Sequence, residues 1–290
     1  MPDSPEQFPG PGENTYPADA ESSAEMARLM RQERLVTSGM KGIFPEDIDL
    51  NGVQRVLDLA CGPGGWALEA AYKYSDMEIV GVDISERMIA YANAQAKVQR
   101  RSNAHFQVMN ILQPLDFSAS SFDLVNARFI SSFMKREQWP VFFKECLRVL
   151  RPGGIVRLTE IEPGFSNKPH LEQTLHRINL MVNRAGVNFS PNGYYYGILH
   201  MLPSLFRQAG LSVLGNMAHL LEYSSHTPAH ESFHHDLAMT FSVLESAMEK
   251  TKVATLQEWR DLYTRGLAEM LDDDFCAAWM ILTVWGQKPG

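Results

Sequence analysis

The chain has 290 residues, is 45% apolar and carries a formal net charge of −8 at pH 7. This length and apolar fraction allow a substantial core, in one large α/β domain with an embellishment or in two small domains. We expect a single domain over residues 1–290. The acidic balance excludes a general nucleic-acid binder, which needs a basic face, and favours a small-molecule partner.

The cysteines and the apolar runs indicate the compartment. Cys61, Cys146 and Cys276 are odd in number and widely spaced, which is typical of reduced thiols rather than of a disulfide framework. No apolar run reaches the roughly 18 residues of a membrane span, and the N-terminus has no apolar signal core. We therefore expect a cytoplasmic protein without membrane segments. A homo-oligomer is compatible with the sequence, although no motif predicts one.

The first 45 residues are expected to contain a tail and a cover. Residues 1–20 are rich in proline and glycine and predict a mobile tail. From Ser22 the apolar spacing predicts a helix that ends near Gly39 or Gly42. Residues 21–45 would then form a helical lid, and Tyr16 would close over a bound ligand.

A strand, a glycine loop and a helix follow directly. Residues 53–59 form an apolar run around Asp58, glycines stand at 62, 64 and 65, and helical spacing resumes at Trp66. This arrangement brings backbone N–H groups close to a ligand.

The next hundred residues alternate between strands and helices. Ser85 is expected to cap a helix, and another helix is expected over residues 139–150. Strands are expected over residues 78–83, 105–109, 122–127 and 155–161. The alternation predicts a doubly wound, Rossmann-like parallel sheet with helices on both faces.

The alternation breaks after the last of these strands. Residues 163–200 contain a helical segment, a loop rich in glycine and asparagine, and three consecutive tyrosines, which we interpret as an insertion that caps the substrate. A long helix is expected to begin at Thr227–Pro228. Further helices are expected over 199–209 and 256–271, and strands over 211–221 and 277–285.

Polar side chains stand at the ends of the expected strands, where open α/β sheets bind their ligands. They are Asp58, Asp83, Asn110 and Asn126. Asp83 is placed to accept hydrogen bonds from ribose hydroxyls, while Ile84 and Met88 are placed to pack on an adenine. Asn110 would read the exocyclic amine of the base.

Two cofactors compete for the glycine loop. The spacing Gly62-x-Gly64-x-x-Ala67 also matches a dinucleotide fingerprint, so NAD is one reading. Asp58 stands at the mouth of the loop, where it would repel a pyrophosphate and attract a cation. S-adenosylmethionine carries an ammonium and a sulfonium together with the ribose and adenine, so Asp58 favours it.

Four successive motifs resemble those of class I S-adenosylmethionine-dependent methyltransferases. They are VLDLACGPGG, VGVDIS, NILQPLDFSASSFDLV and LRPGG, spread over residues 54–161. The resemblance is strongest to the group acting on small molecules, which includes quinone-biosynthesis and natural-product enzymes.

That resemblance implies a seven-stranded, mostly parallel sheet whose last strand is antiparallel. It implies S-adenosyl-L-methionine as cofactor and S-adenosyl-L-homocysteine as product. Ala60 and Asn110 stand where glycine and aspartate are more usual, and both substitutes are tolerable there. The cofactor contacts that it implies are Asp58, Ala60, Gly62, Gly64, Asp83, Ile84, Met88, Asn110 and Ile111, to which we add Tyr16 and Asn126.

The acceptor side of the site is less defined by the sequence. We expect Arg128, Phe129, Tyr194 and Tyr195 to contact a small apolar or aromatic acceptor. Such a transfer needs alignment and exclusion of water, and a base where the nucleophile must lose a proton. His226 and His200 are the candidate bases.

Other interpretations remain beside methyl transfer. The same fold could use the cofactor for a cyclisation or rearrangement, or could bind it as a regulatory protein. The segment His230–His234 matches the H-E-x-x-H pattern of zinc proteases. The expected fold does not host that chemistry, so we expect no metal.

Overall fold

The computed structural model describes residues 19, 21–45 and 47–290. Tyr16 and all of the expected 1–20 tail except Asp19 lie outside the described residues. The strands are β1 (Arg55–Leu59), β2 (Glu78–Asp83), β3 (Ala104–Val108), β4 (Phe122–Arg128), β5 (Leu150–Ser166), β6 (Ser212–Glu222) and β7 (Ala277–Gln287). The α-helices are α1 (Ser23–Gly39), α2 (Gly65–Lys73), α3 (Glu86–Val98), α4 (Trp139–Val149), α5 (Pro169–Arg184), α6 (Ile198–Gln208), α7 (His230–Val243), α8 (Glu245–Lys250) and α9 (Leu256–Glu269).

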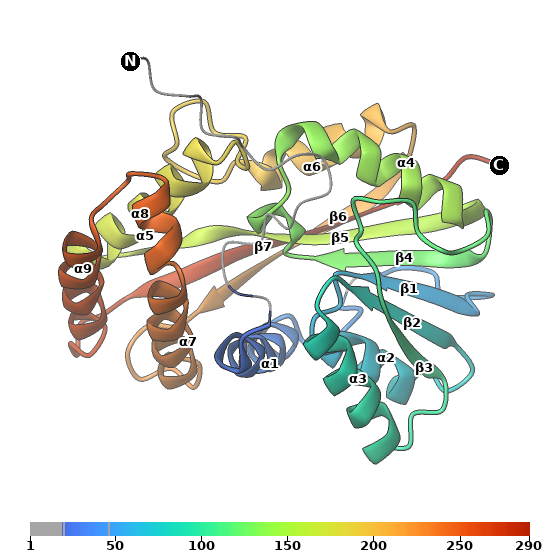
Figure 1. Ribbon diagram of the computed structural model, residues 1–290, viewed down its shortest axis with the longest axis horizontal. Helices are drawn as coiled ribbons and strands as arrows, with labels where there is room; N and C mark the ends of the chain where they lie inside the picture. Colours follow the sequence, from blue (N-terminus) through green and yellow to red (C-terminus); the bar gives the residue numbers. More distant parts are fainter. Residues whose placement is uncertain (1–18, 20, 46) are drawn as a thin grey trace, which may run out of the picture.

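The strands form one seven-stranded sheet in the order β3-β2-β1-β4-β5-β7-β6 (Figure 1). Strands β1 to β5 pair in parallel, whereas β7 runs antiparallel to both β5 and β6. The expected Rossmann-like, mostly parallel sheet of seven strands is therefore confirmed, including the antiparallel last strand.

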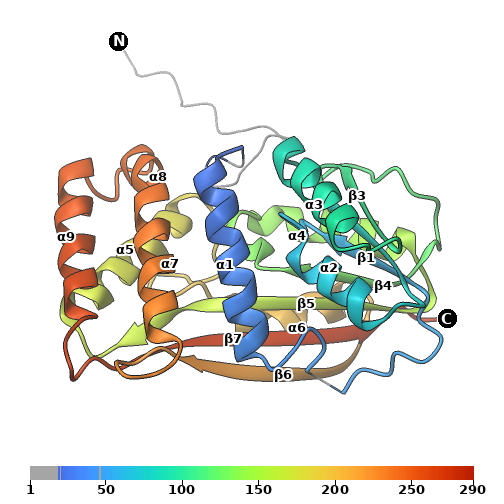
Figure 2. The same ribbon diagram turned by 90° about the horizontal axis from the view of Figure 1, so that it is seen from below.

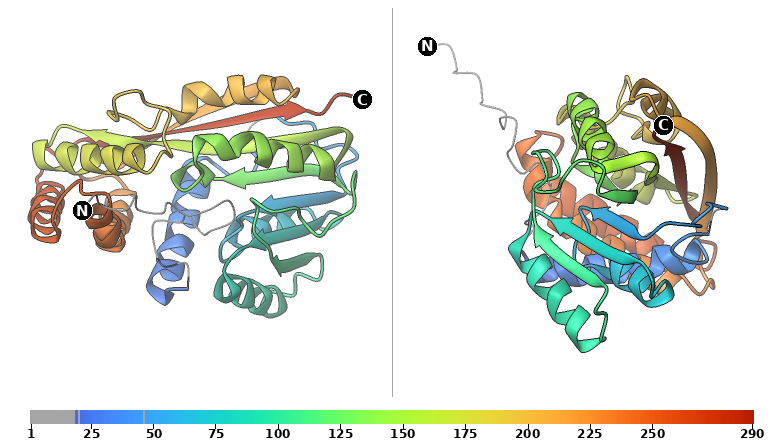
Figure 3. Two further views of the ribbon diagram at one scale, coloured as in Figure 1. Left: turned by 45° about the horizontal axis from the view of Figure 1, so that its top comes forward. Right: turned by 90° about the vertical axis from the view of Figure 1, so that its right-hand side faces the viewer.

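Helices cover both faces of the sheet, as a doubly wound fold requires. α4 and α6 lie on one face, and α1, α2, α3 and α7 lie on the other (Figures 1 and 3). Seen from below, α1 lies between α7 and α2, although α7 follows it by about 190 residues of chain (Figure 2). Two apolar clusters fill the layers, one of them centred on Trp66, Ile79 and Leu124.

Strand β5 is longer than the expected 155–161. It begins at Leu150 and ends at Ser166, because β7 continues to pair with it as far as Ser166 opposite Ala277. The first four residues of the expected 163–200 insertion therefore belong to the sheet. β5 and β7 together extend beyond the end of β4 and carry α5 at that end.

The helix expected at Thr227–Pro228 begins later, at His230. The Thr227 hydroxyl donates to the carbonyl of Ser224 at 2.7 Å and so closes a turn instead of capping a helix. Helices α7, α8 and α9 all lie between β6 and β7 in the chain and pack beside α1 and α5. The sequence did not indicate that this segment covers the end of the sheet. Among the residues that the structure describes, no helix is long and apolar enough to cross a membrane.

Candidate active site

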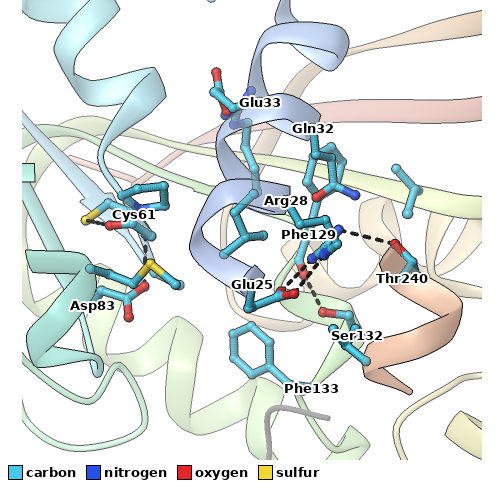
Figure 4. Close-up of a pocket in the computed structure, with 18 of the residues that line it drawn as sticks. Glu25, Arg28, Gln32, Glu33, Cys61, Asp83, Phe129, Ser132, Phe133 and Thr240 are labelled. Carbon is cyan, nitrogen blue, oxygen red and sulfur yellow. Dashed lines mark hydrogen bonds and ion pairs between the residues drawn. The ribbon is translucent and has the colours of Figure 1, made fainter. Parts of the chain in front are cut away.

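A cavity of about 270 Å³ opens at the carboxyl end of β1, β2 and β4. Its walls come from the glycine loop after β1, from α1, from α5 and from α7 (Figure 4). The predicted site residues that line it are Asp58, Ala60, Gly62, Asp83, Ile84, Met88, Asn110, Ile111, Arg128 and Phe129. Side chains predicted from separate motifs are thus brought to one cavity.

Asp58 belongs to a row of three polar side chains that crosses the centre of the sheet. Asp58 on β1 pairs in register with Asn126 on β4, which pairs in register with Arg157 on β5. The Asn126 amide donates to Asp58 Oδ1 at 2.7 Å, and Arg157 Nη1 donates to Asn126 Oδ1 at 2.7 Å. All three residues are buried. Asn126 therefore orients Asp58 from the neighbouring strand and does not line the cavity.

The surroundings of Asp58 make its pKa sensitive to the charge of a ligand bound next to it. Burial raises the pKa of Asp58 to about 7, although Asn126 and the Arg157 guanidinium both oppose the rise. A cation placed next to Asp58 would favour its ionised form and lower this pKa. The sequence analysis missed Arg157, which could have been flagged as a charged residue within an expected strand that is mostly apolar.

Asp83 anchors the glycine loop to the end of β2. Its Oδ2 accepts from the backbone N–H of Gly62 at 2.9 Å, and its Oδ1 accepts from the N–H of Ser85 at 2.9 Å. Each carboxylate oxygen has a second acceptor position, so Asp83 can hold the loop and still accept from a diol. Burial raises its pKa.

Three residues of the loop, Ala60, Gly62 and Gly64, adopt a left-handed conformation. Ala60 has φ +54°, which explains why glycine is the more usual residue at this position. Gly64 caps the N-terminus of α2 with φ +81°, and an added Cβ would lie 2.8 Å from the Phe106 ring. Gly64 is thus a structural residue of the loop and does not line the cavity.

The rim of the cavity next to Asp83 comes from α3 and from the turn after β3. Ser85 caps α3, with its hydroxyl accepting from the N–H of Met88 at 3.1 Å, and so brings Met88 to the cavity wall. Asn110 Oδ1 accepts from the N–H of Leu112 at 2.9 Å, which fixes the turn that carries Ile111. Ile84 is 38% exposed at the rim.

Arg128 and Phe129 form the wall opposite the loop. Arg128 pairs with Glu33 of α1, and Nη1 of Arg128 donates to the Thr37 hydroxyl at 3.4 Å. Burial, with the nearby Arg157 guanidinium, lowers the pKa of Arg128 to about 9. Arg128 therefore fastens α1 to the sheet.

A buried carboxyl holds the turn that follows. Phe129 has φ +59°, an uncommon conformation for a residue with a side chain. Glu160 accepts from the backbone N–H groups of Ile130 and Ser131 at 3.0 and 3.3 Å, and from the Ser131 hydroxyl at 2.5 Å. Burial nevertheless raises the pKa of Glu160 to about 8.

The sequence did not predict the individual residues that α1, α5 and α7 contribute to the cavity wall. α1 contributes Glu25, Arg28, Gln32 and Glu33, and α7 contributes Leu237 and Thr240 (Figure 4). Apolar side chains from α5, β5 and β7 also line this side of the cavity. They are Ile161, Pro163, Leu175, Ile178, Met181, Val182 and Trp279.

The structure places the remaining predicted residues elsewhere. His226 lies on an exposed turn, 3.9 Å from Asp273, and does not line the cavity. His200, Tyr194 and Tyr195 line a second, more open hollow of about 790 Å³, which shares only Pro163 and Leu175 with the first cavity. Within the described part of the chain, the first cavity has no histidine in its walls.

The H-E-x-x-H segment has another role. His230 Nε2 contacts the carbonyl oxygen of Met270 at 2.7 Å, and His234 Nε2 contacts that of Leu267 at 3.2 Å. Both rings therefore hold the C-terminal end of α9 against α7.

Comparisons with known proteins agree with this geometry. The family model for a methyltransferase domain matches residues 56–154, which include the glycine loop, Asp83 and Asn110. The demethylmenaquinone methyltransferase of Lactococcus lactis is 32% identical over 126 residues, which are 43% of this chain and 48% of that protein. The methyltransferase str3 of Strobilurus tenacellus is 27% identical over 115 residues, which are 40% of this chain and 38% of that protein. The matches thus span less than half the length of these two relatives.

Solved structures share the fold over most of the chain. The [4+2]-cyclase SpnF superimposes with a TM-score of 0.53 and 23% identity. The match covers 97% of this chain and 89% of the SpnF chain. A putative methyltransferase from Bacillus halodurans superimposes with a TM-score of 0.52 and 15% identity. The match covers 90% of this chain and 99% of that protein. The chain therefore has the fold of class I S-adenosylmethionine-dependent methyltransferases. The match of residues 56–154 to the methyltransferase domain model agrees with this fold.

The raised pKa of Asp58 predicts a dependence of stability on pH. Its protonated form is favoured in the folded protein, so its contribution is complete below the ordinary pKa of 3.8 and is lost as the pH rises through about 7. The full contribution is about 4 kcal/mol. Denaturant unfolding over this pH range should therefore show a steeper loss of stability in the native protein than in Asp58→Asn. Equal slopes for the two proteins would contradict the assignment.

Proposed function

We propose that the protein transfers the methyl group of S-adenosylmethionine to a small, apolar or aromatic acceptor. The observation that carries the proposal is the position of Asp58 and Asp83, which face one cavity from either side of the glycine loop. Asp58 suits the cationic methionine part, Asp83 suits the ribose hydroxyls, and Met88, Ile84, Asn110 and Ile111 suit the adenine. The Lactococcus lactis relative, named for a quinone precursor, supports a small-molecule acceptor.

The proposed step is an in-line displacement. The acceptor nucleophile forms a bond to the methyl carbon while the bond from sulfur to that carbon breaks, and S-adenosylhomocysteine leaves. The protein contributes alignment and a dry cavity. The wall of Phe129, Phe133 and the α5 side chains supplies the apolar surface, and Arg128 with Glu33 holds α1 over it.

The proposal extends to the segments around the cavity and to the setting of the protein. Residues 21–45 act as the lid and residues 163–200 as part of the acceptor cap, since α1 and α5 both line the cavity. The three free cysteines support a reducing, cytoplasmic compartment. A role in secondary metabolism is part of the same proposal and rests on the resemblance of the sequence motifs to those of natural-product enzymes.

A second candidate uses the same cofactor without methyl transfer. The likeness to SpnF, named as a [4+2]-cyclase, motivates it. Incubation with S-adenosylmethionine carrying a deuterated methyl group and an extract of small molecules separates the two. Methyl transfer predicts a product heavier by the labelled methyl and one S-adenosylhomocysteine per product. A changed product without label would support the second candidate instead.

Replacing Asp83 tests the cofactor site itself. Asp83→Ala removes both ribose acceptors and the anchor of Gly62, so we expect the affinity for S-adenosylhomocysteine to fall by about tenfold or more, the loss of a charged hydrogen-bond partner. Titration calorimetry measures it. Asp76→Ala, at an exposed carboxylate between α2 and β2, is the matched control and should bind as the native protein does. Unchanged affinity in Asp83→Ala would refute the ribose assignment.

A further inference from the structure

A group of polar side chains interrupts the apolar wall on the side of the cavity away from the glycine loop. It comes from two helices, with Glu25, Arg28 and Gln32 on α1 and Asp236 and Thr240 on α7, and we call it the α1–α7 polar cluster. Figure 4 shows Arg28 between Glu25 and Thr240, beside Phe129. Glu25, Arg28, Gln32 and Thr240 line the cavity, and Asp236 lies behind Arg28.

The guanidinium of Arg28 is already engaged by both carboxylates. Its Nε and Nη2 donate to the two oxygens of Glu25 at 2.8 and 2.6 Å. Its Nη1 lies 3.6 Å from Asp236 Oδ1 and 3.5 Å from the Thr240 hydroxyl. The side chains of Glu25, Arg28 and Asp236 are 1%, 8% and 2% exposed. The cluster is thus a built, buried site and not a solvated surface group.

The cluster carries more negative than positive charge. Among the residues that the structure describes, the two carboxylates of Glu25 and Asp236 face one guanidinium, while the neighbouring pair of Glu33 and Arg128 is balanced. Within the described residues, Asp236 Oδ1 is buried without a hydrogen-bond partner, and burial raises the pKa of Asp236 to about 6. Because an incompletely paired buried charge is costly, the cluster is stabilised by a ligand that brings donors or positive charge. An anion would increase the imbalance.

From this geometry, and resting on the proposed methyl transfer, we propose that the cluster selects the acceptor. The acceptor is an apolar molecule with one hydroxyl or ammonium group, which donates to Glu25 while Gln32 and Thr240 flank it. Carboxylate and phosphate acceptors are excluded by the same charge. Glu25 is then a specificity-determining residue, and Asp236 acts through Arg28.

Three matched probes test the selection. They are 2-phenylethanol, 2-phenylethylamine and 3-phenylpropanoate, together with their naphthyl counterparts, titrated into the protein with and without S-adenosylhomocysteine. The alcohol or the amine should bind at least about tenfold more tightly than the carboxylate, a typical effect of one unfavourable charge contact. Glu25→Gln should reduce this difference to about threefold or less by removing one carboxylate. Glu231→Gln, at an exposed position of α7, should leave it unchanged.

The outcomes separate the two proposals. Equal or tighter binding of the carboxylates, a preference that survives Glu25→Gln, or no binding of any probe would overturn the selection by the cluster. If Glu25→Gln does not fold, as judged by circular dichroism, Asp236→Asn takes its place with the same expected loss of preference. Failure of S-adenosylhomocysteine to bind the native protein would instead overturn the proposed function, because the ranking of the probes is measured without it as well.

Discussion

The row Asp58–Asn126–Arg157 is the interaction on which the rest of the site depends. It crosses three neighbouring strands in register, directly beneath the glycine loop. Each of the three side chains is buried and therefore needs a hydrogen-bond partner within the row. Asn126 donates to the Asp58 carboxyl and accepts from the Arg157 guanidinium, and so links the two. Removing one partner from such a buried chain typically costs about 3–5 kcal/mol. The row therefore fixes both the position of Asp58 and its readiness to ionise.

The same row influences the walls on either side of it. Arg157 stacks on the Phe44 ring at 5.3 Å, which ties the segment after α1 to the sheet. Its charge also contributes to the lowered pKa of Arg128, the residue that fastens α1 through Glu33. Burying charges at the end of the strands is costly in free energy. These charged side chains are held in place by one another, so the electric field in the cavity is established before a ligand binds.

The sequence was sufficient for the part of the fold that local patterns determine. Strand β2 has the bounds expected from its apolar run, and Ser85 caps α3 as expected. Asp58, Asp83 and Asn110 meet at one edge because parallel strands end there. Ala60, expected to be tolerable in place of glycine, adopts the left-handed conformation that makes glycine usual.

What the sequence could not supply was contact between distant segments. Arg28 meets Thr240 across 212 positions of chain, and no periodicity in either helix indicates the other. The extension of β5 depends on its pairing with β7, and α7 packs against α1, which lies far from it in the chain. The ability of His226 and His200 to accept a proton says nothing about where they lie in the fold, and the packing of α1, α5 and α7 places other side chains in the cavity.

Proton release on cofactor binding tests the central claim most directly. If Asp58 receives the cationic part of S-adenosylmethionine, binding lowers its pKa from about 7, so the native protein should release a fraction of a proton near that pH. Calorimetric titrations in two buffers of different ionisation enthalpy measure this release, and Asp58→Asn should show none. Binding without proton release in the native protein, or equal release in the variant, would contradict the account.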